Sequence, residues 1–297
     1  FGDQIGPLED CQSLSMKLGG APANVACHLS ALGHSVRFRT RVGADPFGQL
    51  ALNRLRANQV QVDGEVRLPG NETGLCFVTR TKQGQRHFLH RGGDTFIGLD
   101  ADDLTWLEAN RQRALILTAS SLRRQSALES LEKQLEKREN WTAMDPGSIP
   151  KYWTASGRLK TLIARLARTL DVLKISSDEA PFLTGHDDLE QALSTLNSWG
   201  AALVIITVGS DGALWRIGRA SGQCRAPEVE CIDSTGAGDA FMAALMGGLS
   251  AFRPASEEWA PAIPHVIEQA NQYASKLVGH VGASPDAFVR DFGCSPA

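Results

Sequence analysis

The chain has 297 residues, of which 42% are hydrophobic and 21% charged, and its formal net charge is −3 at pH 7. This is ordinary globular composition, and without a long basic run it does not favour nucleic acid as a partner. No apolar run approaches the ~20 residues of a membrane helix and no signal peptide is expected, so we predict no membrane partner and a cytoplasmic location.

Strand-like and helix-like segments alternate along the chain. In chain order we predict a helix over residues 21–32, a strand over 36–42, a helix over 46–58, a hairpin of strands 73–81 and 86–91, a helix over 101–110, a strand over 114–118, a helix over 122–138, a strand over 141–144, a helix over 156–170, a strand over 171–175, a helix over 189–199, a strand over 202–208, and helices over 236–252 and 264–278. This order indicates an α/β fold whose mainly parallel sheet is covered on both faces. The hairpin breaks the alternation and is typical of an antiparallel lid.

The cysteines and histidines do not suggest a metal site or disulfides. Six cysteines occur, with no CxxC pair and several in apolar segments: Cys11, Cys27, Cys76, Cys224, Cys231 and Cys294. We interpret them as buried thiols of a reducing compartment. His87 and His90 lie on one predicted strand without nearby cysteines, so a metal site is not expected there. The basic alternation at residues 36–41 is typical of a solvated or ion-paired strand face.

The stretch IDSTGAGDAF, residues 232–241, places Gly236, Ala237 and Gly238 directly before Asp239 and a helix. The first N–H groups of a helix lack internal partners and carry partial positive charge, and small residues let a phosphate approach them. Asp239 would then be placed to accept the proton of an attacking hydroxyl. The alternative is a glycine-rich turn with an acid that favours the helix N-terminus electrostatically.

A second element, KLGGAPANV, joins paired glycines to a helix that begins near Pro22 and carries Asn24 in its first turn. An asparagine there can donate and accept hydrogen bonds to a polyol, although a simple capping turn would look the same. The chain lacks both a GxGxxG fingerprint and the Gly-Lys pair of a P-loop. An NAD-dependent oxidoreductase is therefore disfavoured, and any nucleotide must be held in another way.

Taken together, these motifs resemble the ribokinase-like (PfkB-type) carbohydrate kinases. IDSTGAGDAF resembles the family's C-terminal signature, and GGAPANVACHLSALG with RVGADPFGQL resembles its N-terminal region. KISSDEAPFLTG, TVGSDGALW and ANQYASKLVGHVGAS follow in the family's order, and GGAPAN with KIS..E is most similar to the fructokinase branch. The resemblance implies a three-layer α/β/α fold with a mainly parallel central sheet and a small β lid. It also implies a single kinase domain over residues 1–297, with the lid near residues 4–18 and 60–98.

The resemblance implies a role for each matching position. Asp239 would be the catalytic base, and the amides of Gly236, Ala237 and Gly238 would form the anion hole for the γ-phosphate. The expected sugar-binding residues are Asp3, Gly19, Gly20, Asn24 and Arg91. The expected ATP-binding residues are Ser176, Thr207, Gly209, Gly212, Asn271 and Ala274. Glu179 would organise Mg²⁺ through water, and a monovalent cation, K⁺, would bind near Asp233 and Thr235.

The sequence departs from the fructokinase pattern in three places. Ser176 stands where the NxxE motif has asparagine, as is common among fructokinase-like members. In Asp145-Pro146-Gly147-Ser148-Ile149, Gly147 and Ile149 stand where fructokinases usually have asparagine and arginine. The loss of polar contacts there leaves the identity of the sugar open.

We therefore expect an enzyme that uses ATP and Mg²⁺ to phosphorylate a small-molecule sugar, D-fructose at its 6-hydroxyl being the first choice. The alternatives are a kinase for another small sugar or nucleoside, such as ribose, 2-keto-3-deoxygluconate or adenosine, and a fructokinase-like protein that binds ligands or partners without catalysis. The family also includes homodimers, often formed through the lid, and the sequence leaves the oligomeric state open.

Overall fold

The computed structural model of the chain describes residues 6–63, 66–80, 86–92, 98–109, 114–122, 128–136, 140–147, 156–252 and 257–285. The chain divides into two compact units. The first comprises Phe1–Ile97, Val229–Ala240 and Lys276–Ala297, and the second comprises Gly98–Glu228 and Phe241–Ser275. Whether they act as the single predicted kinase domain stays a prediction.

The second unit is built on one sheet, whose described strands run in the order β12-β11-β10-β9-β8-β7. The strands are β7 (Ala114–Leu117), β8 (Trp141–Met144), β9 (Val172–Ser176), β10 (Leu203–Thr207), β11 (Ala213–Ile217) and β12 (Ala220–Cys224). Strands β7 to β10 are parallel, which confirms the predicted sheet, and β11 and β12 extend it as an antiparallel hairpin. The sequence analysis did not assign this hairpin, because its second strand is polar and largely exposed.

Helices cover one face of the sheet. They are α3 (Ala101–Ala109), α4 (Leu128–Glu136), α5 (Ser156–Ala167), α6 (Ala180–Thr184) and α7 (Leu189–Ser198). Because side chains alternate along a strand, Leu173 and Ile175 of β9 point to this face with Val204 and Ile206 of β10, and all four join the buried core of these helices. Within the predicted helix over residues 122–138, the structure describes α4 and Leu122, which ends a 3₁₀ turn, η2 (Ala119–Leu122); the remaining residues lie outside the described part of the chain.

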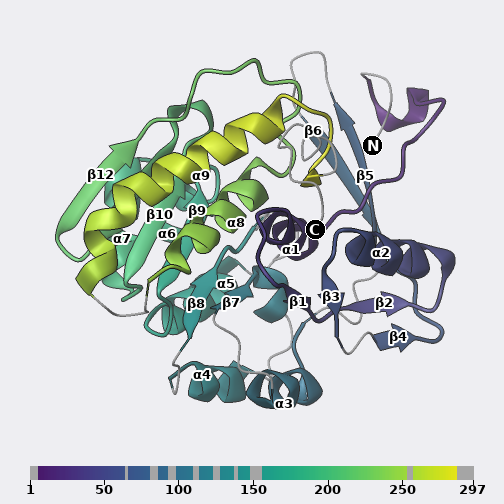
Figure 1. Cartoon of the computed structure of the whole chain (residues 1–297), viewed down its shortest axis with the longest axis horizontal. Coiled ribbons are helices and arrows are strands. Elements are labelled where there is room, and N and C mark those ends of the chain that lie inside the picture. Colours follow the sequence, from purple (N-terminus) through teal and green to yellow (C-terminus); the bar gives the residue numbers. More distant parts are fainter. Residues whose placement is uncertain are drawn as a thin grey trace. The chain divides into compact units, whose positions relative to one another are not determined.

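The opposite face is covered by parts of α8 (Ala237–Leu249) and α9 (Ile263–Val278), as Figure 1 shows. Here the fully buried Trp141 of β8 packs edge-on against Trp259 of the 3₁₀ segment η6 (Glu257–Ala262), with ring centroids 5.0 Å apart. The two helices approach closely at Gly248, where a Cβ would lie 2.8 Å from Cγ1 of Val266. The unit is therefore a three-layer α/β/α structure, as predicted.

The described elements that lie wholly within the first unit are short. They are η1 (Leu8–Asp10), α1 (Ala21–Ala31), β1 (Arg37–Phe38), β2 (Arg41–Gly43), α2 (Pro46–Ala57), β3 (Gln61–Val62), β4 (Val66–Leu68), β5 (Leu75–Arg80) and β6 (Arg86–Arg91). The antiparallel β5–β6 hairpin confirms the prediction, and η1 packs against β5 within the region expected to form the lid. The predicted strand over residues 36–42 is wrong in one respect. It is two strands, because β1 pairs with β3 and β2 pairs with β4.

The described cysteines are in no disulfide, and their predicted burial is only partly correct. Cys27 and Cys224 are buried, whereas Cys76 and Cys231 are exposed. Cys76 is exposed because it lies on the two-stranded hairpin, and Cys231 because it lies in the irregular segment before α8. Cys294 lies outside the described residues. Among the described residues, no helix has the length and apolar character needed to cross a bilayer.

Asp45 holds the start of α2 and the segment before β5 together. As the N-cap residue it accepts a hydrogen bond from Gly48 N at 2.8 Å, and it also accepts bonds from Thr73 N at 2.6 Å and Thr73 Oγ1 at 2.8 Å. Burial alone would raise the pKa of Asp45, but the bonds from Thr73 and Gly48 outweigh it and hold the pKa below its ordinary value. The folded state therefore favours the carboxylate form.

We predict that Asp45→Ala lowers the free energy of unfolding by about 1–2 kcal/mol, because it removes a helix cap and two further bonds. The effect is complete above the unfolded-state pKa of an aspartate and is lost as the pH falls through the lowered folded-state pKa. Urea unfolding at neutral and acidic pH measures it. Asp188→Ala, which removes the α7 N-cap bond to Gln191 N, is the matched control, and an equal loss in both variants would contradict the role given to Thr73.

Candidate active site

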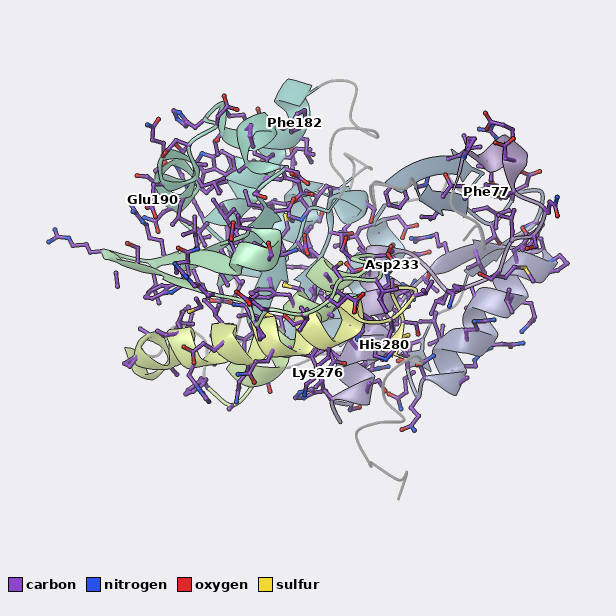
Figure 2. All side chains as sticks on the ribbon, turned by 90° about the horizontal axis from the view of Figure 1, so that it is seen from above. Phe77, Phe182, Glu190, Asp233, Lys276 and His280 are labelled. Atoms are coloured by element: carbon purple, nitrogen blue, oxygen red, sulfur yellow. The ribbon has the colours of Figure 1, made fainter. Side chains whose placement is uncertain are left out.

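The turn before α8 is held by Asp233, whose side chain is 3% exposed. Its Oδ1 accepts from Thr235 N at 2.9 Å and Thr235 Oγ1 at 2.5 Å, and its Oδ2 accepts from Gly282 N at 3.0 Å. The backbone N–H groups of Ile232 and Asp233 both donate to the carbonyl of Val278. Figure 2 shows Asp233 beside the end of α9, where Lys276 and His280 lie. These bonds tie residues 232–235 to the segment that follows α9 and fix the entry into α8.

Gly236 has the backbone conformation that only glycine adopts readily, with φ +81°. A Cβ here would lie 2.5 Å from Cβ and 2.7 Å from Cα of Ala283, so no other residue fits. The first intrahelical bond of α8 runs from Ala240 N to Gly236 O at 2.8 Å. The N–H groups of residues 237–239 therefore lie at the positive end of the helix dipole, which is suited to bind an anion.

Asn24 holds the carboxylate of Asp239. Its Nδ2 donates to Asp239 Oδ2 at 2.7 Å, and its side chain is 5% exposed in the first turn of α1. Within the described residues, its buried Oδ1 has no hydrogen-bond partner. A buried acceptor of this kind calls for a donor such as a hydroxyl. The assignment of Asn24 to the sugar stays a prediction, and what the structure shows is its bond to the candidate base, Asp239.

The other predicted sugar-binding residues are Gly19, Gly20, Arg91 and Asp3. Gly19 and Gly20 are exposed, and a Cβ at either position would meet nothing within 4 Å, so their backbone is open to a ligand. Arg91 ends β6, is exposed and donates to the carbonyl of His90 at 3.2 Å. Asp3 lies outside the described residues. The roles of these four residues stay predictions.

In the second unit, two buried acids that follow the carboxyl ends of β8 and β9 lie near a buried lysine in the middle of β9. Lys174 Nζ lies 2.7 Å from Asp145 Oδ2, and both side chains are at most 7% exposed. Glu179, 5% exposed, accepts a bond from Ser176 N at 2.8 Å. The second oxygen of Asp145, Oδ1, is buried without a partner among the described residues. The sequence analysis did not select Lys174 or Asp145. The available signal was a lysine inside the apolar strand VLKIS, since a buried lysine requires a partner.

The environment of Glu179 favours its protonated form. Burial raises its pKa, the nearby Asp145 carboxylate raises it further, and the Lys174 ammonium and the Ser176 bonds only partly oppose this. Strongly shifted pKa values of this kind cluster at functional sites. Within the described residues, no group of three or more His, Cys, Asp and Glu side chains is arranged to enclose a metal by itself.

The predicted ATP-side residues lie on neighbouring strand ends. Ser176 and Thr207 are paired in the parallel register of β9 and β10, and Ser177 N donates to Thr207 O at 2.9 Å. The edge of the sheet where parallel strands end is the usual ligand edge of such folds. Gly209 faces open space, whereas a Cβ at Gly212 would lie 2.7 Å from Ala226 N. Gly212 is therefore required for packing, whatever else it does.

Asn271 and Ala274 lie one turn apart on α9. The Asn271 side chain is 4% exposed, and its Nδ2 donates to Cys224 O at 2.9 Å and to Arg225 O at 3.4 Å. Its amide therefore holds the chain at the end of β12, and Ala274 is half-buried. The assignment of both residues to adenine stays a prediction.

Gly147 has φ +60°, in the left-handed region. Glycine and asparagine are the residues that most readily adopt this conformation. The departure from the fructokinase pattern at this position is therefore compatible with the same backbone, while the side-chain amide is absent. Ile149 lies outside the described residues.

We predict that Lys174→Met lowers the free energy of unfolding by about 3–5 kcal/mol, because it leaves Asp145 and Glu179 buried without a cation. The double variant Asp145→Asn with Lys174→Met should recover most of this loss. Urea unfolding of both variants measures the effect. Arg165→Met, which breaks a solvent-exposed pair with Glu132, is the control and should have a much smaller effect. An equally small loss in Lys174→Met would contradict a structural role for the buried pair.

Known proteins resemble the chain over most of its length. Residues 3–287 match the model of the pfkB family carbohydrate kinases. The chain is 31% identical over 249 residues to probable fructokinase-6, chloroplastic, of Arabidopsis thaliana, which is 82% of this chain but only 65% of that protein. It is 29% identical over 275 residues to the fructokinase of Vibrio alginolyticus, which is 89% of this chain and 86% of that enzyme.

The crystal structure of fructokinase from Vibrio cholerae O395 in its fructose, ADP and calcium ion bound form has the same fold. It is 28% identical with a TM-score of 0.78, over 92% of this chain and 89% of that one. This likeness agrees with the predicted three-layer architecture. With the family match over residues 3–287 and the Gly236–Asp239 turn in place, the chain belongs to the pfkB family of carbohydrate kinases.

Proposed function

We propose that the protein transfers the γ-phosphoryl group of ATP to a sugar hydroxyl, with the 6-hydroxyl of D-fructose as acceptor. The observation that carries this proposal is the placement of Asp239. Its carboxylate lies in the first turn of α8, directly after the small residues of the turn, and Asn24 fixes its orientation. The fructokinase names of the relatives and the fructose and ADP bound to the Vibrio cholerae enzyme support the same substrates.

In this mechanism Asp239 accepts the proton of the sugar hydroxyl as the oxygen forms its bond to the γ-phosphorus. The bond from that phosphorus to the bridging oxygen breaks, and ADP leaves with the bonding electrons. The amides of Gly236, Ala237 and Gly238 stabilise the negative charge on the transferring group. Asn24 holds Asp239 through one side-chain atom, and its free Oδ1 accepts a hydrogen bond from the sugar.

The donor groups in the second unit fit Mg²⁺. The buried, unpartnered Oδ1 of Asp145 and the carboxylate of Glu179 are oxygen donors, the kind that Mg²⁺ prefers. When bound, the metal neutralises phosphate charge. K⁺ fits less simply, because both oxygens of Asp233 already accept bonds from Thr235 and Gly282. We therefore assign no step to a monovalent cation.

We predict that Asp239→Asn lowers kcat by about 10²–10⁴-fold while ATP and sugar still bind, because the variant keeps the shape but loses the base. ADP release with fructose, glucose, ribose, 2-keto-3-deoxygluconate and adenosine measures it. The control is Asp102→Asn, an exposed acid in the first turn of α3. Turnover of another substrate on the panel would keep the mechanism and change the acceptor. No turnover by a folded protein that binds ATP would contradict the kinase proposal and favour a binding role.

We predict that Glu179→Gln raises the Mg²⁺ concentration needed for half-maximal rate by about 10- to 100-fold. The wild-type rate should fall as the pH is lowered, because protonated Glu179 can no longer serve the metal. Since the pKa of Glu179 is raised, this fall should begin at a higher pH than it would for an ordinary glutamate. The fold favours the protonated form, so the variant should be no less stable than the wild type at neutral pH. Mg²⁺ titrations and thermal unfolding test this, with the neighbouring exposed Asp178→Asn as control. An unchanged Mg²⁺ requirement would remove Glu179 from the proposed metal site.

A further inference from the structure

Helix α1 presents two polar side chains to the candidate site, one turn apart. Asn24 bonds to Asp239, and His28, four residues later, is completely buried with Nε2 3.0 Å from the carbonyl of Ala283. Residues four apart lie on the same face of a helix. Because a carbonyl can only accept, Nε2 of His28 carries the hydrogen of this bond.

Three side chains form hydrogen bonds to the backbone of residues 281–283, the segment that receives this bond. Gly282 N donates to Asp233 Oδ2, Lys17 Nζ donates to Val281 O at 3.2 Å, and His28 holds the next residue, Ala283. Of the three, the bond from His28 is the one that reaches Ala283 itself.

Ala283 in turn sets the space available to Gly236. Its Cα and Cβ lie where a side chain of Gly236 would begin. Interiors are packed too densely for one side of such a contact to shift alone. A displacement of Ala283 therefore either opens a gap beside Gly236 or moves the turn that leads into the first N–H groups of α8.

We propose that His28 is a positioning residue for the anion hole. Its bond to Ala283 holds that residue against Gly236 and so fixes where the amides of residues 236–238 point. The inference rests on the proposed kinase function for its effect on rate, but the contact itself does not. An apolar side chain could fill the space of His28 without the cost of burying a polar ring. We therefore attribute the positioning of Ala283 to the hydrogen bond of His28 and not to its volume.

Two substitutions separate the hydrogen bond from the volume. His28→Gln keeps an N–H donor on a side chain of similar reach, and His28→Leu fills the space without a donor. We expect His28→Leu to lower kcat by about 10- to 100-fold, because a small misplacement of groups around the transferring phosphoryl is costly. The KM for the sugar should change by less than about threefold, since the His28 side chain is completely buried. His28→Gln should keep kcat within about threefold of wild type.

Amide hydrogen exchange gives a readout that does not depend on turnover. In His28→Leu, exchange should become faster in residues 232–240 and 278–285 and remain unchanged elsewhere, whereas His28→Gln should match the wild type. His34→Leu, just beyond the end of α1, is the control and should leave both segments unchanged. Ala283→Gly removes the other half of the contact and should give the same local exchange pattern if His28→Leu does not fold.

The outcomes are distinct. Wild-type kcat and wild-type exchange in a folded His28→Leu would overturn the inference, as would an equal loss in His28→Gln and His28→Leu, which would indicate a packing role only. Should the wild type turn over no sugar, the proposed function fails. Faster exchange confined to the two segments would still support the positioning role.

Discussion

The close approach of Gly236 to Ala283 is the constraint on which the candidate site depends. It fixes the left-handed turn at Gly236, the turn fixes where α8 begins, and the start of α8 fixes Asp239. Asp233 holds the same turn by accepting hydrogen bonds from Thr235, within the turn, and from Gly282, which precedes Ala283. A phosphoryl-transfer site requires groups that are in place before the reaction, since their reorganisation would add to the barrier. Here that order is achieved by packing and by one buried carboxylate.

In the second unit, buried charges and not close packing determine the properties of the candidate site. Lys174 and Asp145 pair directly, and Glu179 remains as a carboxylate whose ionisation the surroundings disfavour. Two acids and one base leave the cluster with a net charge of −1 when all three groups are ionised. A divalent cation would offset this negative charge. Within the described residues, the buried Oδ1 of Asp145 is an acceptor without a hydrogen-bond partner and could bind it.

The sequence predicted most of the elements and the turn at residues 236–239, because strand and helix periodicity and glycine placement are local properties. It did not predict what depends on pairing across the chain. The stretch over residues 36–42 alternates like one strand, yet its halves pair with different partners. Lys174 and Asp145 are 29 residues apart, so only the parallel order of β8 and β9 brings them together. Likewise, nothing local to His28 indicates that its partner is Ala283.

Glycines in a motif can be required by close packing, or they can leave the backbone open to a ligand. The space that a Cβ would meet at each glycine distinguishes the two cases. Gly212 and Gly236 are enclosed by other parts of the chain, so glycine is required there even without a ligand. Gly19, Gly20 and Gly209 face open space, so packing does not account for them. The absence of a side chain at these three positions leaves backbone exposed that a sugar or a nucleotide can approach. A motif match cannot separate enclosed from open glycines, because both give the same letters. Of the open positions, Gly20 at φ +95° and Gly209 at φ +54° still require glycine for their backbone conformation. Gly19 has no such requirement, so its substitution should affect binding with little effect on the fold.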